Sequence, residues 1–148
     1  MKSRLPSLIV ALLLCLLPLA AFAEEAAGVV RTMTGTARVV RAGVEMPVSP
    51  GFRLLEGDKL VTGPESSLGV FMRDDASLSL GSLTEVNIDR FRFSPAEQQY
   101  SFVTRILRGT MCYLSGLIGK LSPESAVFET PVASLSIRGT RFAVKVDG

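Results

Sequence analysis

Two adjacent acidic residues, Asp74-Asp75, form the carboxylate pair in this sequence that is best suited to general acid–base catalysis or to calcium binding. The pair follows the alternating segment 68–72 and precedes Leu78 and Leu80, so it falls in a turn between two strands. Acidic side chains in such turns usually accept hydrogen bonds from backbone amides. We therefore predict that Asp74-Asp75 caps backbone amides and is not catalytic.

The chain contains no histidine, which excludes Ser-His-Asp and Cys-His catalysis as normally built, together with histidine-containing zinc sites. Cys112 has no histidine base to activate it, and we interpret it as a small buried apolar residue between Met111 and Tyr113. An intermolecular disulfide is the alternative. No GxxxxGK[ST] phosphate-binding loop is present. We predict no enzymatic activity, no cofactor and no metal site.

The N-terminus has the three-part pattern of a secretory signal peptide. Lys2 and Arg4 precede the apolar run 8–17, and Ala21-Phe22-Ala23 supplies a small-residue cleavage site. A membrane-spanning helix needs roughly 20 apolar residues, about twice the length of this run. A lipoprotein at Cys15 would require small residues where two leucines stand. We predict cleavage after Ala23, with residues 1–23 as the signal peptide and 24–148 as one exported domain.

The charge of the exported domain bears on its partners. Removal of residues 1–23 takes away Lys2 and Arg4, two of the 16 basic residues and none of the 14 acidic ones, and leaves 14 of each sign. Nucleic-acid binding depends on a large cationic surplus. We therefore expect no nucleic-acid partner, and the exported chain offers no membrane-spanning segment.

Turn signals recur about every 8–12 residues, a spacing typical of an all-β sandwich or barrel. Segment 98–107 reads as a long strand that pairs in a hairpin with 85–93, whereas the prolines of 46–51 predict an edge strand or loop. A single helical turn within 114–122 is the one departure. The predicted fold is a single all-β domain, a β-sandwich or β-solenoid-like arrangement of short antiparallel strands.

Near the C-terminus the alternation of apolar residues changes phase. Leu135 and Ile137 are apolar at odd numbers, whereas the apolar residues of 142–146 have even numbers. Because side chains on a strand alternate between faces, one residue must be absorbed between the two sets, at Arg138-Gly139-Thr140. We predict two core-facing strands joined by this corner. A second Arg-Gly-Thr at 108–110 suggests a rolled or solenoid-like architecture.

These motifs resemble a known family. Thr130-Pro131 followed by Arg138-Gly139-Thr140 and an alternating strand resembles the end of the FecR domain, named for periplasmic regulators of iron-citrate uptake. The segment 54–62, with Gly57-Asp58 and Thr62, is similar to the other signature of that family. The resemblance covers residues 29–146 and implies a domain without known catalytic chemistry. The residues that it marks as structural are Gly57, Asp58, Thr62, Thr130, Pro131, Arg138, Gly139 and Thr140.

Among the charged residues of these motifs, Arg138 has the largest number of alternative roles. From a corner its guanidinium would bond free carbonyls or pair with an acidic side chain, for which Asp58 is one candidate, or it would bind a carboxylate of a partner. We favour the structural role, and we expect Thr130 and Thr140 to bond backbone groups at turns. Four further arginines alternate with apolar residues and are predicted to lie on a solvated sheet face: Arg38, Arg41, Arg90 and Arg92.

The resemblance and the signal peptide together predict a non-catalytic module that binds, scaffolds or senses in the bacterial cell envelope, located in the periplasm or secreted. Its partner would be an envelope protein or a cell-wall component. The sequence shows neither the cytoplasmic segment nor the membrane helix of the family's regulators, so their sigma-factor signalling does not carry over. The sequence ends soon after the strand 142–146, where family members continue, which indicates either a short member or an incomplete sequence. In the second case an exposed edge strand would favour a homodimer or strand addition by a partner.

Two other functions stay open. The first is a carbohydrate- or peptidoglycan-binding module, which two tyrosines and no tryptophan make less favourable because aromatic rings stack on sugars. The second is a glycoside hydrolase that uses paired carboxylates.

Overall fold

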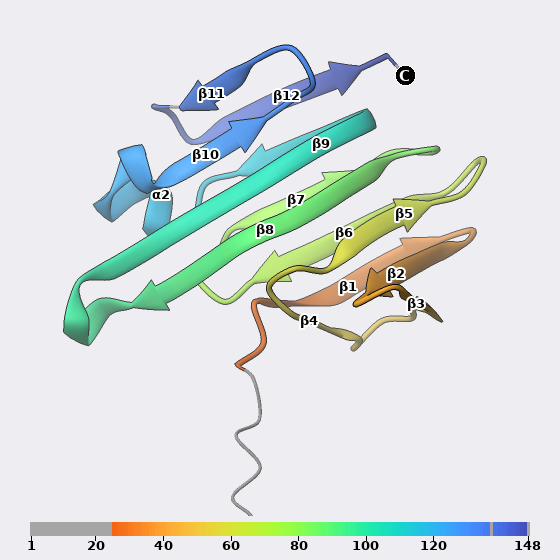
Figure 1. The fold of residues 1–148 in the computed structure, drawn as a ribbon, viewed down its shortest axis with the longest axis horizontal. Coiled ribbons are helices and arrows are strands. Elements are labelled where there is room, and N and C mark those ends of the chain that lie inside the picture. Colours follow the sequence, from red (N-terminus) through yellow and green to blue (C-terminus); the bar gives the residue numbers. More distant parts are fainter. Residues whose placement is uncertain (1–24, 137, 148) are drawn as a thin grey trace, which may run out of the picture.

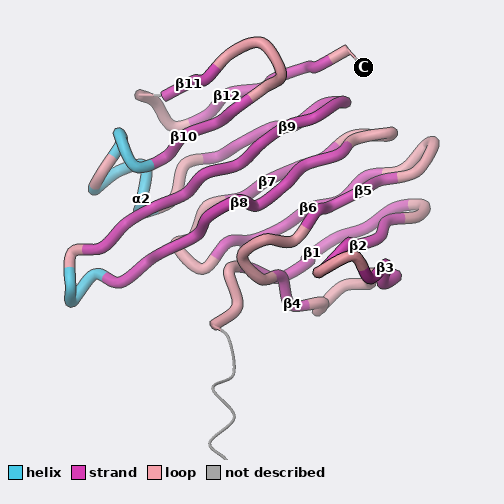
Figure 2. The backbone as a smooth tube through the Cα atoms, in the orientation of Figure 1, coloured by secondary structure: helices cyan, strands magenta, loops and turns pink. Residues whose placement is uncertain are grey.

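The computed structural model describes residues 25–136 and 138–147, so the predicted signal peptide lies outside the described residues. The described residues form twelve strands, and their short helical segments are confined to the links between strands (Figures 1 and 2). The strands are β1 (Gly28–Thr34), β2 (Ala37–Arg41), β3 (Val44–Pro47), β4 (Arg53–Leu54), β5 (Lys59–Thr62), β6 (Ser67–Met72), β7 (Ser77–Leu80), β8 (Glu85–Ser94), β9 (Gln99–Leu114), β10 (Ala126–Glu129), β11 (Ser134–Ser136) and β12 (Arg141–Val146). The helical segments are η1 (Pro95–Glu97), α2 (Leu117–Leu121) and η2 (Pro123–Ser125).

The strands make one curled sheet whose two halves face each other. Layer A has the order β4-β1-β6-β7-β9-β12, and layer B has the order β3-β2-β5-β8-β9-β10-β11. Strand β9 belongs to both layers, because its first part pairs with β8 and β10 and its last part pairs with β7 and β12. Only the β9–β10 pair among the described strands is parallel. The predicted all-β fold is confirmed.

The chain bends from one layer to the other along a closed rim, on the right of Figure 1. Four segments make this bend, and each contains a glycine. These are the β1–β2, β5–β6 and β7–β8 links, with Gly35, Gly63 and Gly81, and strand β9 itself, with Gly109. Gly109 lies within β9 and has a φ of +92°, a conformation that favours glycine. Arg138-Gly139-Thr140 is different, because it crosses at the opposite rim, where Thr140 accepts a hydrogen bond from Ser115 N (2.8 Å). The two Arg-Gly-Thr copies are therefore not equivalent corners of a repeat.

The core lies between the two layers. Its centre is a group of aromatic rings in edge and tilted contacts, with the Phe102 and Phe128 centroids 5.8 Å apart and those of Tyr113 and Phe128 4.6 Å apart. Phe102 and Phe128 are fully buried, and burial of a side chain of this size stabilises the fold by roughly 1.5–3 kcal/mol. The alternation of segment 68–72 has the predicted effect, because Leu68, Val70 and Met72 are buried.

Several local predictions are confirmed. β8 pairs antiparallel with β9 in a hairpin, with Ile88 opposite Thr104. β3 is an edge strand that ends at Pro47, and α2 is the single helical turn expected within 114–122. In the part of the chain that the structure describes, no helix has the length and apolar character needed to cross a membrane.

The prediction of two core-facing strands near the C-terminus is wrong for the first of them. All three residues of β11 are exposed, with Leu135 36% accessible, and Ile137 lies outside the described residues. β11 pairs only with β10, at the end of layer B, and contributes no residue to the core. β12 does turn Phe142 and Val144 inward, where they are half-buried against the core.

Candidate functional site

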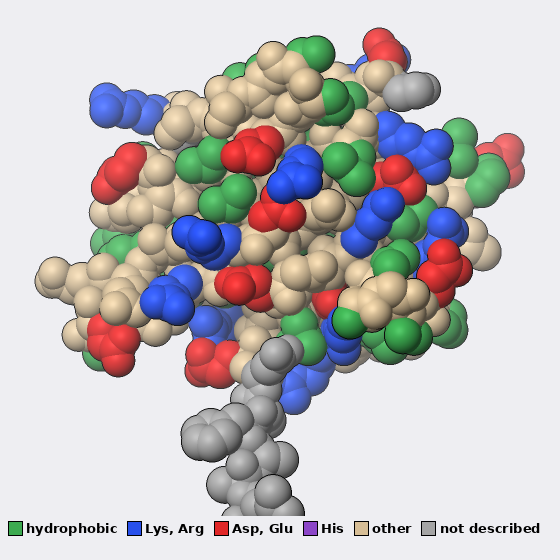
Figure 3. Space-filling view, in the orientation of Figure 1, with side chains coloured by type: hydrophobic (Ala, Val, Ile, Leu, Met, Phe, Trp, Pro, Cys, Tyr) green, Lys and Arg blue, Asp and Glu red, His purple; other side chains and the backbone are tan. Residues whose placement is uncertain are grey.

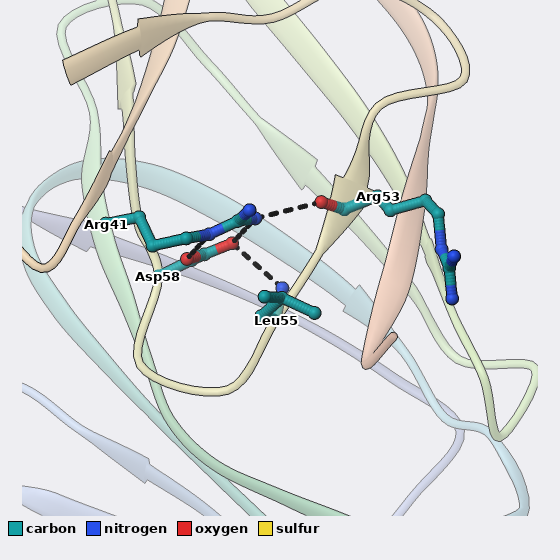
Figure 4. Close-up of polar contacts among 4 residues, drawn as sticks. All are labelled: Arg41, Arg53, Leu55 and Asp58. Atoms are coloured by element: carbon teal, nitrogen blue, oxygen red, sulfur yellow. Dashed lines mark hydrogen bonds and ion pairs between the residues drawn. The ribbon is translucent and has the colours of Figure 1, made fainter. Parts of the chain in front are cut away.

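The Gly57-Asp58 motif forms a buried polar corner beside β5. Asp58 is fully buried, and its carboxylate accepts hydrogen bonds from Arg41 Nε (2.8 Å), Arg41 Nη2 (2.7 Å) and Leu55 N (2.8 Å) (Figure 4). Arg41 Nη2 also donates to the carbonyl of Arg53 (3.0 Å). Gly57, with a φ of +90°, makes the tight turn possible. A fork-to-fork pair of this kind fixes both orientation and distance, so it joins β2 to the turn before β5.

The partner of Asp58 is thus Arg41, and the suggested pairing with Arg138 is wrong. Arg138 lies at the opposite end of the sheet order, between β11 and β12, and is exposed. β2 and β5 pair antiparallel with Val40 opposite Lys59, which places Arg41 next to Asp58. Arg41 is therefore not on a freely solvated face, since its side chain is only 33% exposed. Sequence reasoning could not pair Arg41 with Asp58, because this pairing depends on the register of β2 against β5.

The same turn docks on β8. Glu56 Oε2 accepts a hydrogen bond from Phe91 N (2.9 Å), and Gly57 N donates to the carbonyl of Ile88 (2.7 Å). Ile88 N in return donates to the carbonyl of Asp58 (2.9 Å). The register of β8 against β9 shifts between Ile88 and Arg90, so the Glu56 carboxylate satisfies an amide that the irregular ladder leaves available.

Thr62 marks the other end of β5 and belongs to the closed rim. Its hydroxyl donates to the carbonyl of Gly81 (2.6 Å) and accepts from Thr84 N (2.9 Å), and the residue is buried. The next bend along the rim has the same chemistry, because Thr84 Oγ1 accepts from Thr110 N (3.0 Å). Gly57, Asp58 and Thr62 therefore hold the two ends of β5. The Asp58 end combines the ion pair with Arg41 and a bond from Leu55 N, whereas the Thr62 end consists of side-chain bonds to backbone groups.

The later motif residues are more exposed. Thr130 closes the β10–β11 turn, since its hydroxyl accepts from Ala133 N (3.1 Å) and its amide donates to the Ala133 carbonyl (2.8 Å). Pro131, Gly139 and Thr140 are partly or fully accessible to solvent. Arg138 lines a shallow hollow of about 630 Å³ with Glu124.

The pKa of Glu124 lies below its ordinary value for local reasons. Its own backbone amide and the Ser122 hydroxyl, 2.8 Å away, stabilise the carboxylate, and the charge of Arg138 adds to the effect. Glu124 is fully exposed, and the effect of Arg138 on it is electrostatic.

Asp74 has the predicted capping role, whereas no side-chain hydrogen bond of Asp75 is seen among the described residues, where Asp75 is exposed. Asp74 is buried, and its carboxylate accepts from Ala76 N (3.2 Å) in the β6–β7 turn and from Ile118 N (3.1 Å) in α2. Leu117 N donates to the backbone carbonyl of Asp74 (2.7 Å). Burial raises the pKa of Asp74 above its ordinary value, although the backbone bonds oppose that shift. Oδ1 thus closes the β6–β7 turn, whereas Oδ2 and the backbone carbonyl attach α2 to that turn.

The surroundings of Asp74 are apolar and closed. Tyr113 is buried nearby, and burial raises the pKa of its hydroxyl as well. Within residues 25–136 and 138–147, no three His, Cys, Asp or Glu side chains come together in a cluster that could hold a metal ion. Asp74 bonds to α2 at Ile118 N, and the Tyr113 hydroxyl lies beside Gly119 of the same helix.

The outer face of layer B carries charges of both signs that compensate one another (Figure 3). Arg105 lies 2.9 Å from Asp89 and 3.8 Å from Glu129, and Glu85 lies within 3.6 Å of Lys59 and 3.3 Å of Arg108. Exposed pairs of this kind contribute little to stability, about 0–1 kcal/mol each. Ion pairs therefore cover much of this face, and Arg90 and Arg92 on β8 line a further hollow of about 630 Å³ together with Glu56.

The outer face of layer A differs, because small side chains form its floor. Ser79, Cys112 and Ala143 lie opposite one another on the neighbouring strands β7, β9 and β12. Ser77, also on β7, stands between Leu114 on β9 and Phe71 on β6. Three adjoining shallow hollows cross this face, with volumes of about 490, 410 and 320 Å³. Their walls include five basic side chains (Arg31, Arg53, Arg73, Arg141 and Lys145) and two acidic ones (Glu25 and Asp75).

The hollow of about 490 Å³, the largest of these three, combines an aromatic ring with guanidinium groups. Phe71 is 40% exposed, and the guanidinium of Arg31 lies 4.6 Å from its ring centroid. Arg31 sits where the register of β1 against β6 shifts, and such a bulge turns a side chain out of the regular alternation. Arg53 lines the same hollow, whereas Arg73 is paired with Glu25. Arginine with an exposed aromatic ring is the combination that protein interfaces favour.

Cys112 belongs to this outer face. Its neighbours Met111 and Tyr113 are buried, whereas Cys112 itself is half-buried between Ser79 and Ala143. The prediction of a buried apolar cysteine is therefore wrong, because alternation along β9 turns Met111 and Tyr113 inward and Cys112 outward.

Comparison of the chain with protein-family models, with curated proteins and with solved structures finds no match. The resemblance to the FecR domain thus rests on the motifs of the sequence, and their contacts are those given above.

Proposed function

We propose that the protein is a non-catalytic, exported module of FecR type that binds another protein of the bacterial cell envelope through the outer face of layer A. The observation that carries this proposal is the contrast between the two outer faces. Layer B carries exposed ion pairs and a hollow lined mainly by polar side chains, whereas layer A presents adjoining hollows with a small-residue floor, exposed Phe71 and Leu114, and a basic rim. The motif residues support the module by fixing turns, and they leave this face open.

The chemistry of the face favours a partner segment with carboxylates and apolar side chains. Arg31 and Arg53 offer planar forks of donors that match carboxylates, and Phe71 with Leu114 offers apolar surface. The small floor residues let a backbone approach the sheet closely. Aromatic and arginine anchors at the centre of an interface usually supply most of its binding energy.

Site-specific crosslinking in the periplasm tests this proposal. A photoreactive amino acid is placed at Ser79 on layer A and, as the matched control, at Asn87 on layer B, in the full chain expressed with its N-terminal segment in a Gram-negative host. We expect a discrete protein adduct from position 79 only, and we expect Arg31→Glu with Arg53→Glu to remove it. Arg38→Glu with Arg92→Glu on layer B should leave it unchanged.

Three results contradict the proposal. The first is an equal adduct from both positions, and the second is an adduct that is insensitive to the Arg31 and Arg53 substitutions. The third is sedimentation with purified cell-wall sacculi, which would favour the carbohydrate-binding alternative, or the hydrolase if reducing sugar is released. The intact mass of the exported protein also tests the localisation, because cleavage after Ala23 leaves Glu24 as the first residue.

A further inference from the structure

The last strand of layer A presents a regular edge. Among the described strands, β12 pairs only with β9, with Arg141 opposite Leu114 and Val146 opposite Gly109. Ser115 N donates to the carbonyl of Thr140 (2.8 Å), which shows that the even-numbered residues of this segment direct their backbone groups toward β9. In an antiparallel ladder the alternate residues point the other way. The N–H and C=O groups of Arg141, Ala143 and Lys145 therefore face outward along the edge.

The side chains of β12 also alternate. Phe142, Val144 and Val146 turn toward the core but are only half-buried, and Arg141 and Lys145 lie on the outer face. The half-buried apolar row and the unused backbone groups lie on one strand. An added strand that continues layer A would cover both, which is the usual way in which an exposed sheet edge is satisfied.

We propose that β12 pairs antiparallel with β12 of a second copy of this chain, about a two-fold axis at Val144. In this register Ala143 lies opposite Lys145 of the second copy, and each such pair exchanges two backbone hydrogen bonds. Both residues direct their backbone groups to the edge, so the register uses the donors and acceptors that are available. A shift by one residue would pair groups that already bond to β9 and would place outward side chains opposite inward ones.

The side chains of the same register are complementary on both faces. On the inner face Phe142 meets Val146 of the second copy, and Val144 meets Val144. On the outer face Arg141 lies opposite Asp147 of the second copy, so the dimer contains this pair of opposite charges twice. Asp147 is 92% exposed, and within one chain its ion pair is with Lys145 at 3.8 Å. Opposite charges directly across a strand pair stabilise it, and like charges destabilise it.

Charge reversal tests the register without disturbing the core. The full chain, exported and purified, is expected to sediment as a dimer. Arg141→Asp and Asp147→Arg should each weaken the homodimer by about tenfold, because each places like charges opposite each other twice. A mixture of the two variants should recover dimerisation as a heterodimer, since both cross-strand pairs are then of opposite charge. Two variants that stay monomeric when mixed would overturn the proposal.

A disulfide at the axis gives a second readout. Opposite residues of a non-hydrogen-bonded antiparallel pair have Cα atoms about 4.5 Å apart, within the range of about 4.4–6.8 Å that a disulfide spans. In a Cys112→Ser background, Val144→Cys should therefore crosslink the dimer on mild oxidation. Val146→Cys, on the same face but away from the axis, is the matched control. It should form no crosslink, and its dimer should still dissociate on dilution. Equal crosslinking of the two variants contradicts the register.

Ala143→Pro removes an outward donor and leaves the bonds to β9 intact. We expect a folded monomer, checked by an unchanged circular dichroism spectrum. A wild-type chain that sediments as a monomer at every concentration overturns the proposal, as does a dimer that survives Ala143→Pro. The crosslinking test of the layer A face uses Arg31 and Arg53, which lie at the far end of this layer, so the two proposals fail separately.

Discussion

The hydroxyl of Thr84 occupies the space that a Cβ atom on Gly109 would fill, so β8 and β9 interlock where β9 bends between the two layers. Thr84 Oγ1 uses this closeness to accept a hydrogen bond from Thr110 N (3.0 Å). The neighbouring bend mirrors it, because a Cβ on Gly81 would overlap the hydroxyl of Thr110. Glycine and threonine thus alternate between facing strands along the closed rim, and Gly109 admits the hydroxyl that bonds to the backbone amide of Thr110.

Gly109→Ala should destabilise the fold by about 2–5 kcal/mol. A side chain at a φ of +92° costs about 1–2 kcal/mol, and the overlap with Thr84 adds about 1–3 kcal/mol of overpacking. Gly43→Ala is the matched control, because Gly43 has a φ of +80° but open space around it, and only the first cost applies. Urea unfolding measures both variants. Equal losses of stability would show that the interlock with Thr84 is unimportant.

Arg41→Met should destabilise the protein by about 3–5 kcal/mol, because it leaves the Asp58 carboxylate buried without its ion-pair partner. Arg38→Met, in the same strand, removes an exposed pair with Glu45 at 3.5 Å and should cost no more than about 1 kcal/mol. Thermal unfolding of the two variants compares them directly. Similar midpoints would mean that Asp58 finds another partner when Arg41 is absent.

How far the sequence predicts this fold depends on the range of each contact. The alternation at Leu68, Val70 and Met72 and the β8–β9 hairpin are visible because a strand and its turn are local patterns. The Arg41–Asp58 pair requires the register of β2 against β5, and the Thr84–Gly109 interlock requires the bend in β9. Neither register nor bend is a property of one segment, so the prediction assigned Asp58 the wrong arginine.

The error at Leu135 has a different origin. A period of two identifies side chains that share a face, but it does not show whether another layer covers that face. β11 lies at the end of layer B and contributes nothing to the core. β12 lies next to β9, and the ring centroids of Phe142 and Phe128 are 4.7 Å apart. The layer A face escaped prediction for the same reason, because its floor comes from single small residues on separate strands.

Met111 and Cys112 should respond differently to truncation, although they are neighbours. Met111 is 1% exposed, and Met111→Ala is expected to cost about 2–5 kcal/mol. Cys112 faces the solvent side of layer A, so Cys112→Ala should change stability by no more than about 0.5 kcal/mol. Chemical unfolding of both variants checks the orientation of β9. A large loss for Cys112→Ala would place that side chain in the core.

The buried Asp74 carboxyl should make stability fall as pH rises above the ordinary aspartate pKa of 3.8. Burial raises its pKa in the folded protein, so between 3.8 and the raised value the folded protein binds more protons than the unfolded chain. The contribution of Asp74 is therefore complete below pH 3.8 and is lost as the pH rises through the folded-state pKa. Asp74→Asn lacks this titration, and it loses one acceptor for Ala76 N or Ile118 N at a cost of about 1–3 kcal/mol.

The stability difference between the wild type and Asp74→Asn should consequently narrow with increasing pH. Urea unfolding from pH 3 to pH 7 measures that difference, because this range begins below the ordinary aspartate pKa of 3.8. Asp75→Asn is the matched control, since Asp75 is exposed in the same turn, and its difference from the wild type should not follow that course. A gap that widens with pH for Asp74→Asn would mean that the backbone bonds from Ala76 and Ile118 outweigh desolvation and hold the carboxylate ionised.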